Sequence, residues 1–323
     1  MHAIQTEKLS RSFASRSAVK DVTLTVEPGE VFGVLGPNGA GKTTMVRLLN
    51  GVLSPSAGAC RVLGFDPVTQ GGEVRRRTGV LTESPALYER MTARENLHFY
   101  GTLYGMPQEK LSLQVAAMLA AFGLLDRADD RVGSFSKGMK QRLALARSVL
   151  HEPEVLFLDE PTAALDPEAA RRVTELIMEF SHKVGRTVFI CTHYLPEAER
   201  LCDRVAVLNR GSLIAVGTLT ELARTLWHGT WVDIECLIAP DQVLFQTLRA
   251  LPFVTNIRHD NRHLEVQVEN QECIPAVVKE LADHDAQVLR VNPREHTLEE
   301  VYFELQNSPE MAGERLKSEG GQP

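Results

Sequence analysis

Apolar runs recur along the first part of the chain, separated by segments with helical spacing. Val22 to Val26 alternates apolar and polar side chains, as a strand buried on one face does. Continuous apolar segments, which are typical of buried strands, follow at 31–35, 79–83, 154–160 and 187–193. A predominantly helical block lies between the second and third of these segments. The pattern predicts an α/β domain with a helical subdomain.

The helical block contains recognisable start signals. Thr92 and Glu95 fit a capping box, and helical spacing continues from Leu113 to Phe122. Ser136 and Gly138 precede another strongly helical run, so Ser136 is expected at a helix N-terminus, where backbone N–H groups and the helix dipole can bind an anion. A serine at this position is equally what an ordinary helix cap requires.

Beyond Leu226 the order of predicted elements becomes β-α-β-β-α-β. Strands are expected at 231–238, 253–258, 263–268 and 286–291, with helices at 241–251 and 274–282. This order predicts a small ferredoxin-like α+β domain, followed by an amphipathic helix at 297–305. We therefore expect an α/β first domain at 1–228, an accessory α+β domain at 229–306, and a polar, disordered tail at 307–323.

Composition excludes several classes of function. The net charge of -7 gives no support for a nucleic-acid-binding surface. The five cysteines form no C-x-x-C pair, which argues against a zinc site or a disulfide framework and favours a reducing cytosol. No apolar run approaches the roughly 20 residues that span a bilayer, and the polar start is not a signal peptide. Any role at a membrane is therefore expected to depend on a partner chain.

A phosphate-binding loop follows the strand at 31–35 and leads into a helix at 45–51. It fits G-x-x-x-x-G-K-[ST] and consists of Gly36, Pro37, Asn38, Gly39, Ala40, Gly41, Lys42, Thr43 and Thr44. The glycines let backbone N–H groups wrap a triphosphate at the positive end of the helix. Lys42 would reach the β- and γ-phosphates, and the Thr43 hydroxyl would hold Mg²⁺.

Polar residues that could complete such a site follow two later strands. Asp159 and Glu160 end the segment at 154–160; the first could hold Mg²⁺ and the second could polarise an attacking water. The alternative is an acidic turn. His193 ends the segment at 187–193 and could meet a γ-phosphate, although a lone histidine there is usually structural. Phe13 could stack on an adenine ring or belong to the core.

Taken in order, these motifs resemble the ATP-binding subunit of an ABC transporter over roughly residues 1–226. The resemblance assigns an aromatic loop near Phe13, a Q-loop position at Glu83 and a switch histidine at His193. It also assigns the Walker A loop Gly36–Thr44, the signature Phe135–Met139, the Walker B strand Val155–Asp159, the catalytic Glu160 and a D-loop at 163–166. The closing helix at 297–305 is similar to that of drug- or antibiotic-export subunits.

Three departures from the family pattern bear on the site. Lys137 and Met139 replace a glycine and a glutamine of the usual LSGGQ signature, and Glu83 replaces the usual Q-loop glutamine. A carboxylate at that position is a hard, anionic ligand suited to Mg²⁺. Glu83 is therefore predicted to join Thr43 and Asp159 at the metal, although an exposed loop glutamate without metal contact is the alternative.

The resemblance implies a function as well as a fold. Two subunits would enclose two ATP molecules with Mg²⁺, each Walker A loop facing Ser136 and Gly138 of the other subunit. Lys42, Glu160 and His193 would carry out hydrolysis, which drives export through a separate multi-span permease at the cytoplasmic face of the membrane. No nucleic-acid partner is expected. The competing hypothesis is a soluble ABC ATPase acting on nucleic acid or ribosomes; such proteins typically carry two cassettes, long coiled-coil insertions or zinc modules.

Overall fold

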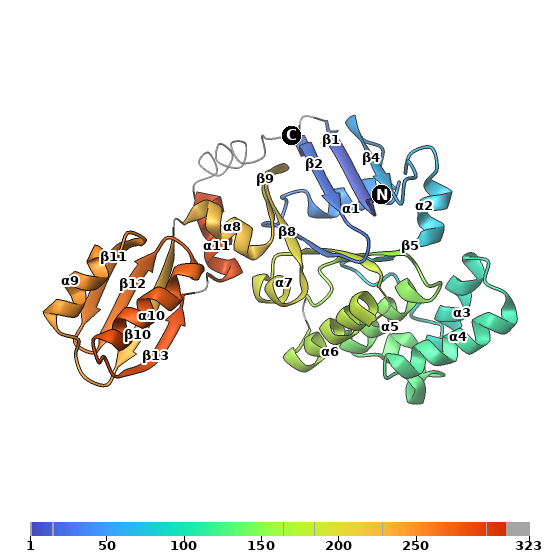
Figure 1. Cartoon of the computed structure of the whole chain (residues 1–323). Helices are drawn as coiled ribbons and strands as arrows, with labels where there is room; N and C mark the ends of the chain where they lie inside the picture. Colours follow the sequence, from blue (N-terminus) through green and yellow to red (C-terminus); the bar gives the residue numbers. More distant parts are fainter. Residues whose placement is uncertain are drawn as a thin grey trace. The chain divides into compact units, whose positions relative to one another are not determined.

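The chain forms two compact units, Met1–Thr218 and Leu219–Pro323, in the computed structural model (Figure 1). The structure describes residues 2–14, 16–163, 165–183, 185–227, 229–294 and 296–307. The predicted tail at 307–323 thus lies, apart from its first residue, outside the described residues. The units divide at Thr218, whereas the sequence pattern placed the boundary at residue 228.

The first unit is built on a nine-stranded sheet of described residues in the order β4-β1-β2-β9-β8-β3-β7-β6-β5. Strands β8, β3, β7, β6 and β5 run parallel, whereas β1 pairs antiparallel with β2 and β4, and β8 with β9. The strands are β1 (Ile4–Phe13), β2 (Arg16–Val26), β3 (Val31–Leu35), β4 (Ala57–Val62), β5 (Thr78–Leu81), β6 (Val155–Asp159), β7 (Thr187–Thr192), β8 (Arg204–Asn209) and β9 (Ser212–Gly217).

The central parallel strands are buried on both faces. In β7, Val188 and Ile190 join one apolar core while Phe189 joins a second, because successive side chains of a strand point to opposite faces. Phe32 of β3 and Phe157 of β6 lie with Phe189 in the second core, where their rings approach that of Phe189 to 5.9 and 5.6 Å. Burial on both faces explains why these strands are continuous apolar runs rather than alternating ones.

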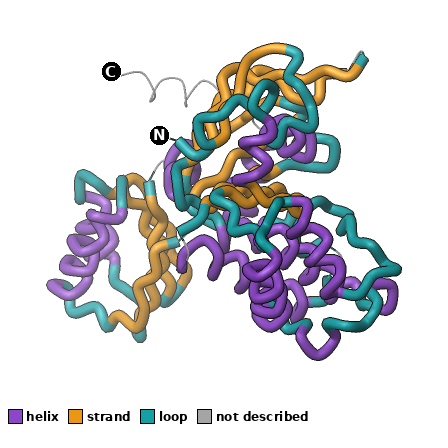
Figure 2. The backbone as a smooth tube through the Cα atoms, turned by 90° about the vertical axis from the view of Figure 1, so that its right-hand side faces the viewer, coloured by secondary structure: helices purple, strands orange, loops and turns teal. Residues whose placement is uncertain are grey.

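The helical block and the antiparallel strands β1, β2 and β4 lie at opposite ends of this unit, as Figures 1 and 2 show together, whereas α1 packs against β2 and β4. Helices α3, α4 and α5 pack on one another and form the predicted helical block. The helices are α1 (Lys42–Leu49), α2 (Gly71–Arg77), α3 (Ala93–Leu103), α4 (Gln108–Ala121), α5 (Lys137–Val149), α6 (Pro167–Met178) and α7 (Leu195–Leu201), with the 3-10 helices η1 (Leu125–Arg127) and η2 (Val132–Ser134) and the π-helix η3 (Glu179–Lys183).

Two predicted helix starts are present. The Thr92 side chain accepts a hydrogen bond from the Glu95 backbone N–H, and the Glu95 carboxylate accepts one from the Thr92 N–H, which completes the capping box at α3. Ser136 is the N-cap of α5, and its hydroxyl accepts from the Met139 N–H at 3.2 Å. The order of these elements confirms the α/β class.

The second unit confirms the predicted β-α-β-β-α-β order. Its four-stranded antiparallel sheet has the order β11-β12-β10-β13 and packs against two helices through an apolar core. The elements are β10 (Thr230–Cys236), α9 (Gln242–Ala250), β11 (Val254–Asp260), β12 (His263–Val268), η4 (Gln271–Cys273), α10 (Ile274–Asp283) and β13 (Val288–Pro293). Asn261, in the turn of the β11–β12 hairpin, has a φ of 51°, which asparagine tolerates better than most residues.

The unit boundary differs from the prediction because of α8 (Leu219–Leu226). This helix packs against α11 (Leu298–Asn307), the predicted closing helix, and so belongs to the second unit. Leu222 of α8 is buried, as are Val301 and Leu305 of α11. The pairing joins segments far apart in the sequence, so no local pattern announces it. Within the described residues, the helices are too short or too polar to cross a bilayer.

Candidate nucleotide site

The parallel strands bring the predicted site residues to one edge of the sheet. Leu35 pairs with Thr192 at the ends of β3 and β7, and Asp159 pairs with Cys191 at the end of β6. The carboxyl ends of parallel strands share one edge, which is where ligands bind in open α/β sheets. The Walker A loop, Glu160 and His193 each follow one of these ends.

The Walker A loop depends on its glycines. Gly41, the N-cap of α1, has a φ of 109°, and a Cβ there would lie 2.3 Å from the carbonyl oxygen of Ala18. A Cβ on Gly36 would lie 2.5 Å from the carbonyl oxygen of Leu208. Pro37, Asn38 and Gly39 are exposed, so the outer part of the loop is open to a ligand. Only glycine fits the two tight positions without moving backbone.

Lys42 is buried at the first position of α1, with 6% of its surface exposed. Its Nζ donates to the Gly36 carbonyl oxygen at 2.7 Å and lies 3.4 Å from Glu160 Oε1. The ammonium group is therefore held inside the loop by the loop's own backbone. A buried cation in this position can meet an anion with little loss of hydration.

Glu160 stands between Lys42 and His193. His193 Nδ1 lies 2.9 Å from Glu160 Oε1, and the Thr192 hydroxyl donates to Oε2 at 3.3 Å. Glu160 has a φ of 52°, in the left-handed region that is uncommon for residues other than glycine. Its backbone N–H donates to the Cys191 carbonyl oxygen at 2.8 Å, which ties this conformation to β7. Contacts with Thr192 and His193 thus hold the Glu160 carboxylate beside Lys42.

Asp159 lies beside two of the other predicted metal ligands. It is buried, and this burial raises the pKa of its carboxyl group above the ordinary value; the negative charges of Glu160 and Glu83 raise that pKa further, while a hydrogen bond from Thr43 lowers it. Thr43 and Glu83 thus both act on the Asp159 carboxyl group, and the three residues supply hydroxyl and carboxylate oxygens. Oxygen donors of this kind suit Mg²⁺, which takes one or two carboxylates and keeps several waters. The described residues contain no metal-binding group of three or more His, Cys, Asp or Glu side chains, and such a water-rich site needs none.

Two predicted ligand groups lie elsewhere. Ser136 and Gly138 lie at the N-terminus of α5, and in the part of the chain that the structure describes no hydrogen bond or ion pair joins them to the Walker A loop. Phe13 is 43% exposed at the end of β1, with the Arg11 guanidinium 4.8 Å from its ring centroid. The core alternative for Phe13 is therefore wrong, while stacking on adenine stays a prediction.

Several side chains that act through their neighbours belong to no sequence motif. Thr192 contacts the Glu160 carboxylate, and the guanidinium of Arg16 lies 3.1 Å from where a Cβ of Gly39 would be. Glu197 of α7, 5% exposed, accepts a hydrogen bond from the Thr162 hydroxyl at 2.8 Å. None of these contacts follows from a motif, because each joins residues on different elements.

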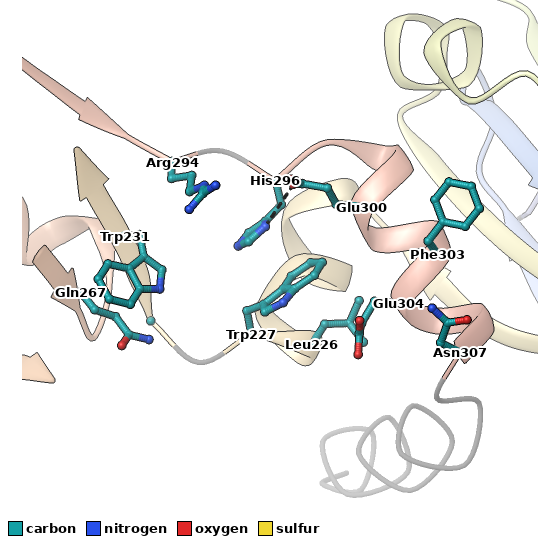
Figure 3. Close-up of a pocket in the computed structure, with 11 residues that line it drawn as sticks. Leu226, Trp227, Trp231, Gln267, Arg294, His296, Glu300, Phe303, Glu304 and Asn307 are labelled. Carbon is teal, nitrogen blue, oxygen red and sulfur yellow. Dashed lines mark ion pairs between the residues drawn. The ribbon is translucent and has the colours of Figure 1, made fainter. Parts of the chain in front are cut away.

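A cleft of about 580 Å³ opens beside the catalytic candidates. Glu160 and His193 line it together with the start of α6 and much of α7. The second unit has a separate groove of similar volume, in which Trp227 stacks on His296 at 3.9 Å and Trp231 lies nearby (Figure 3). That groove contains none of the predicted catalytic or nucleotide-binding residues.

Comparison with known proteins identifies the family. A family model described as ABC transporter matches residues 19–163. The chain is 36% identical over 304 residues to Nod factor export ATP-binding protein I of Paraburkholderia xenovorans, covering 94% of this chain and 96% of that one. It is 37% identical to daunorubicin resistance ATP-binding protein DrrA3 of Streptomyces coeruleorubidus, covering 94% and 95%.

A solved structure of an ATP-binding subunit of an ABC transporter has the same fold, with a TM-score of 0.64 and 32% identity. That similarity covers 69% of this chain and 92% of the solved chain. The chain belongs to the ABC transporter family, as an ATP-binding and ATP-hydrolysing subunit.

Proposed function

We propose that Lys42, Glu160 and His193 form the hydrolytic centre for ATP bound by the Walker A loop. The observation that carries this proposal is the arrangement of Lys42 Nζ and His193 Nδ1 at 3.4 and 2.9 Å from the same carboxylate oxygen of Glu160. Lys42 and the loop N–H groups stabilise the phosphates, and Glu160 accepts the proton of the attacking water. His193 orients Glu160 and reaches the γ-phosphate.

The same edge of the sheet suits Mg²⁺, which neutralises phosphate charge when bound. Thr43, Asp159 and Glu83 would hold it, because Thr43 and Glu83 both interact with the Asp159 carboxyl group. Two of these groups are carboxylates, and burial and mutual repulsion oppose the ionised form of Asp159. A divalent cation among them would favour that ionised form.

A second copy of the chain completes each site. Ser136 and Gly138 lie at a helix N-terminus suited to an anion, but among the described residues no hydrogen bond or ion pair joins them to their own Walker A loop. In a two-fold dimer each chain supplies its loop to one nucleotide and its signature to the other, so two equivalent sites form. ATP binding then closes the dimer, and hydrolysis reopens it. Phe13, whose side chain is exposed, stacks on the adenine.

The dimer powers export through a separate membrane permease and works at the cytoplasmic face of the membrane. The export and resistance roles in the names of the similar proteins support this direction of transport. The acidic balance of the chain disfavours action on nucleic acid or ribosomes. Co-purification with a multi-span membrane protein, rather than with ribosomes or DNA, would support the export role.

Substitution of Glu160 tests the hydrolytic assignment. Glu160→Gln should abolish hydrolysis and accumulate an ATP-bound dimer on gel filtration with Mg-ATP, because other groups hold the phosphates. Lys42→Ala should instead weaken nucleotide binding. Glu168→Gln makes the same change at an exposed position of α6 and should behave as wild type. Hydrolysis by Glu160→Gln near the wild-type rate would show that Glu160 is not the base.

A further inference from the structure

A buried hydrogen bond joins the signature helix to the residue after Glu160. Gln141 lies in the second turn of α5, behind Ser136, with 5% of its surface exposed. Its Nε2 donates to the carbonyl oxygen of Pro161 at 2.7 Å. A buried amide donor is costly to leave unpaired, so this bond fixes the distance between α5 and the Pro161 peptide.

The next residue is held from the other side. The Thr162 hydroxyl donates to Glu197 Oε2 at 2.8 Å, and Glu197 lies on α7, which begins just after His193. The segment 161–162 is therefore anchored between the signature helix and the helix that follows the switch histidine. Both anchors are side chains of buried residues, Gln141 and Glu197, which limits their freedom to move independently.

Glu160 is sensitive to the position of this segment. Its backbone has a φ of 52°, a conformation that persists for a non-glycine residue only when its surroundings hold it. The proposed role of the Glu160 carboxylate requires its Oε1 to stay close to Lys42 Nζ, now at 3.4 Å, and to His193 Nδ1, now at 2.9 Å. A displacement of the Pro161 carbonyl acts directly on this backbone, because the two residues are adjacent.

We propose that Gln141 is a positioning residue that couples the two nucleotide sites of the dimer. The inference rests on the proposed function, in which Ser136 meets the partner's nucleotide while Glu160 acts on the nucleotide of its own chain. When Ser136 binds the partner's nucleotide, the position of α5 is fixed. The hydrogen bond from Gln141 then fixes the position of Pro161 and, through it, that of Glu160. Occupation of one site thereby prepares hydrolysis at the other.

Gln141→Met tests this coupling in the full-length protein. Methionine keeps the length and apolar packing of the side chain but removes the amide donor. The matched control is Gln108→Met, the same change at an exposed residue at the start of α4. ATPase rates measured against ATP concentration give kcat, KM and the Hill coefficient, and a fluorescent ATP analogue reports binding.

The wild type and Gln108→Met should show a Hill coefficient above one. In Gln141→Met we expect kcat to fall on the order of 10- to 100-fold, the effect of a misplaced catalytic group. Its Hill coefficient should fall to one, while affinity for the analogue changes by less than about 2-fold because the binding loop is untouched. If Gln141→Met does not fold, Gln141→Asn, whose amide is one methylene too short, gives the same measurement.

The inference would be overturned by a wild-type Hill coefficient of one, by wild-type kcat and Hill coefficient in the Gln141 variant, or by a lower kcat with unchanged cooperativity. A loss of ATP affinity alone in the Gln141 variant would also contradict it, because Gln141 would then act on the loop. The proposed function is tested separately by Glu160→Gln, whose block of hydrolysis does not depend on Gln141.

Discussion

Replacing Glu197 with glutamine should remove a pH-dependent loss of stability. Burial raises the pKa of the Glu197 carboxyl from 4.5 to about 7; the hydrogen bond from Thr162 opposes this rise, and the negative charge of Glu160 adds to it. Oε1 of Glu197 has no hydrogen-bond partner within the described part of the chain. The ionised form is therefore disfavoured in the folded protein.

Proton linkage gives both the direction and the magnitude of the change in the free energy of unfolding with pH. Between pH 4.5 and 7 the folded chain binds more protons at Glu197 than the unfolded chain, so the free energy of unfolding decreases as pH rises. The full shift of about 2.5 units corresponds to about 3.4 kcal/mol at about 1.36 kcal/mol per unit. About 2.5 kcal/mol of this falls between pH 5 and 8. Glu197→Gln should lack that decrease, since glutamine does not titrate.

Urea unfolding of the nucleotide-free chain at pH 5 and pH 8 measures the difference. Both tryptophans of the chain, Trp227 and Trp231, lie in the second unit, so their fluorescence reports that unit and serves as an internal control. Far-UV circular dichroism reports both units. Glu168→Gln, at an exposed position of α6, should follow the wild type at both pH values.

The comparison between pH values cancels any fixed cost of burying the new amide. The stability gained by Glu197→Gln over the wild type should be about 2.5 kcal/mol larger at pH 8 than at pH 5. An equal difference at both pH values would refute the reasoning, because Glu197 would then not titrate differently in the folded and unfolded chains.

Further predictions concern local structure and the site. Thr92→Ala should lower stability by about 1 kcal/mol through loss of the capping box, measured by thermal unfolding, with Thr92→Ser retaining most of it. Gly41→Ala should abolish binding of a fluorescent ATP analogue, because the new Cβ would meet the Ala18 carbonyl; retained binding would contradict the loop geometry. Glu83→Gln should raise the Mg²⁺ concentration for half-maximal ATPase activity and tighten ATP binding in chelator, and identical curves would remove Glu83 from the site. A chain ending at Thr218 should still bind ATP, whereas an insoluble product would show that the second unit completes the core of the first.

Local sequence signals predicted the elements that carry the chemistry. The apolar run at Val31–Leu35 coincides with β3, and those at 154–160 and 187–193 contain β6 and β7. These strands are recognisable because both of their faces are buried, which demands apolar side chains at every position. The capping box at Thr92 and the hairpin at 260–261 were equally visible, since each depends on a few neighbouring residues.

Local sequence signals did not predict the elements and the boundary that depend on contacts between residues far apart in the sequence. The strands β4, β8 and β9 and the helices α2, α6 and α7 were not individually predicted, because they are short or carry mixed patterns. The unit boundary was placed at residue 228 rather than Thr218, because α8 joins the second unit through its contact with α11. The predicted tail beyond residue 307 is not described, so its disorder stays a prediction.

The sequence by itself determined which residues are candidates for phosphate binding and hydrolysis, because a glycine-rich loop before a helix and carboxylates after a strand have chemistry that is readable locally. Only the tertiary structure decided how they meet. Parallel pairing of β3, β6 and β7 brings Lys42, Glu160 and His193 to one edge of the sheet. The bond from Gln141 to Pro161 likewise spans elements whose separation in sequence conceals it, since contacts of this kind depend on how strands and helices pack and not on the residues beside them.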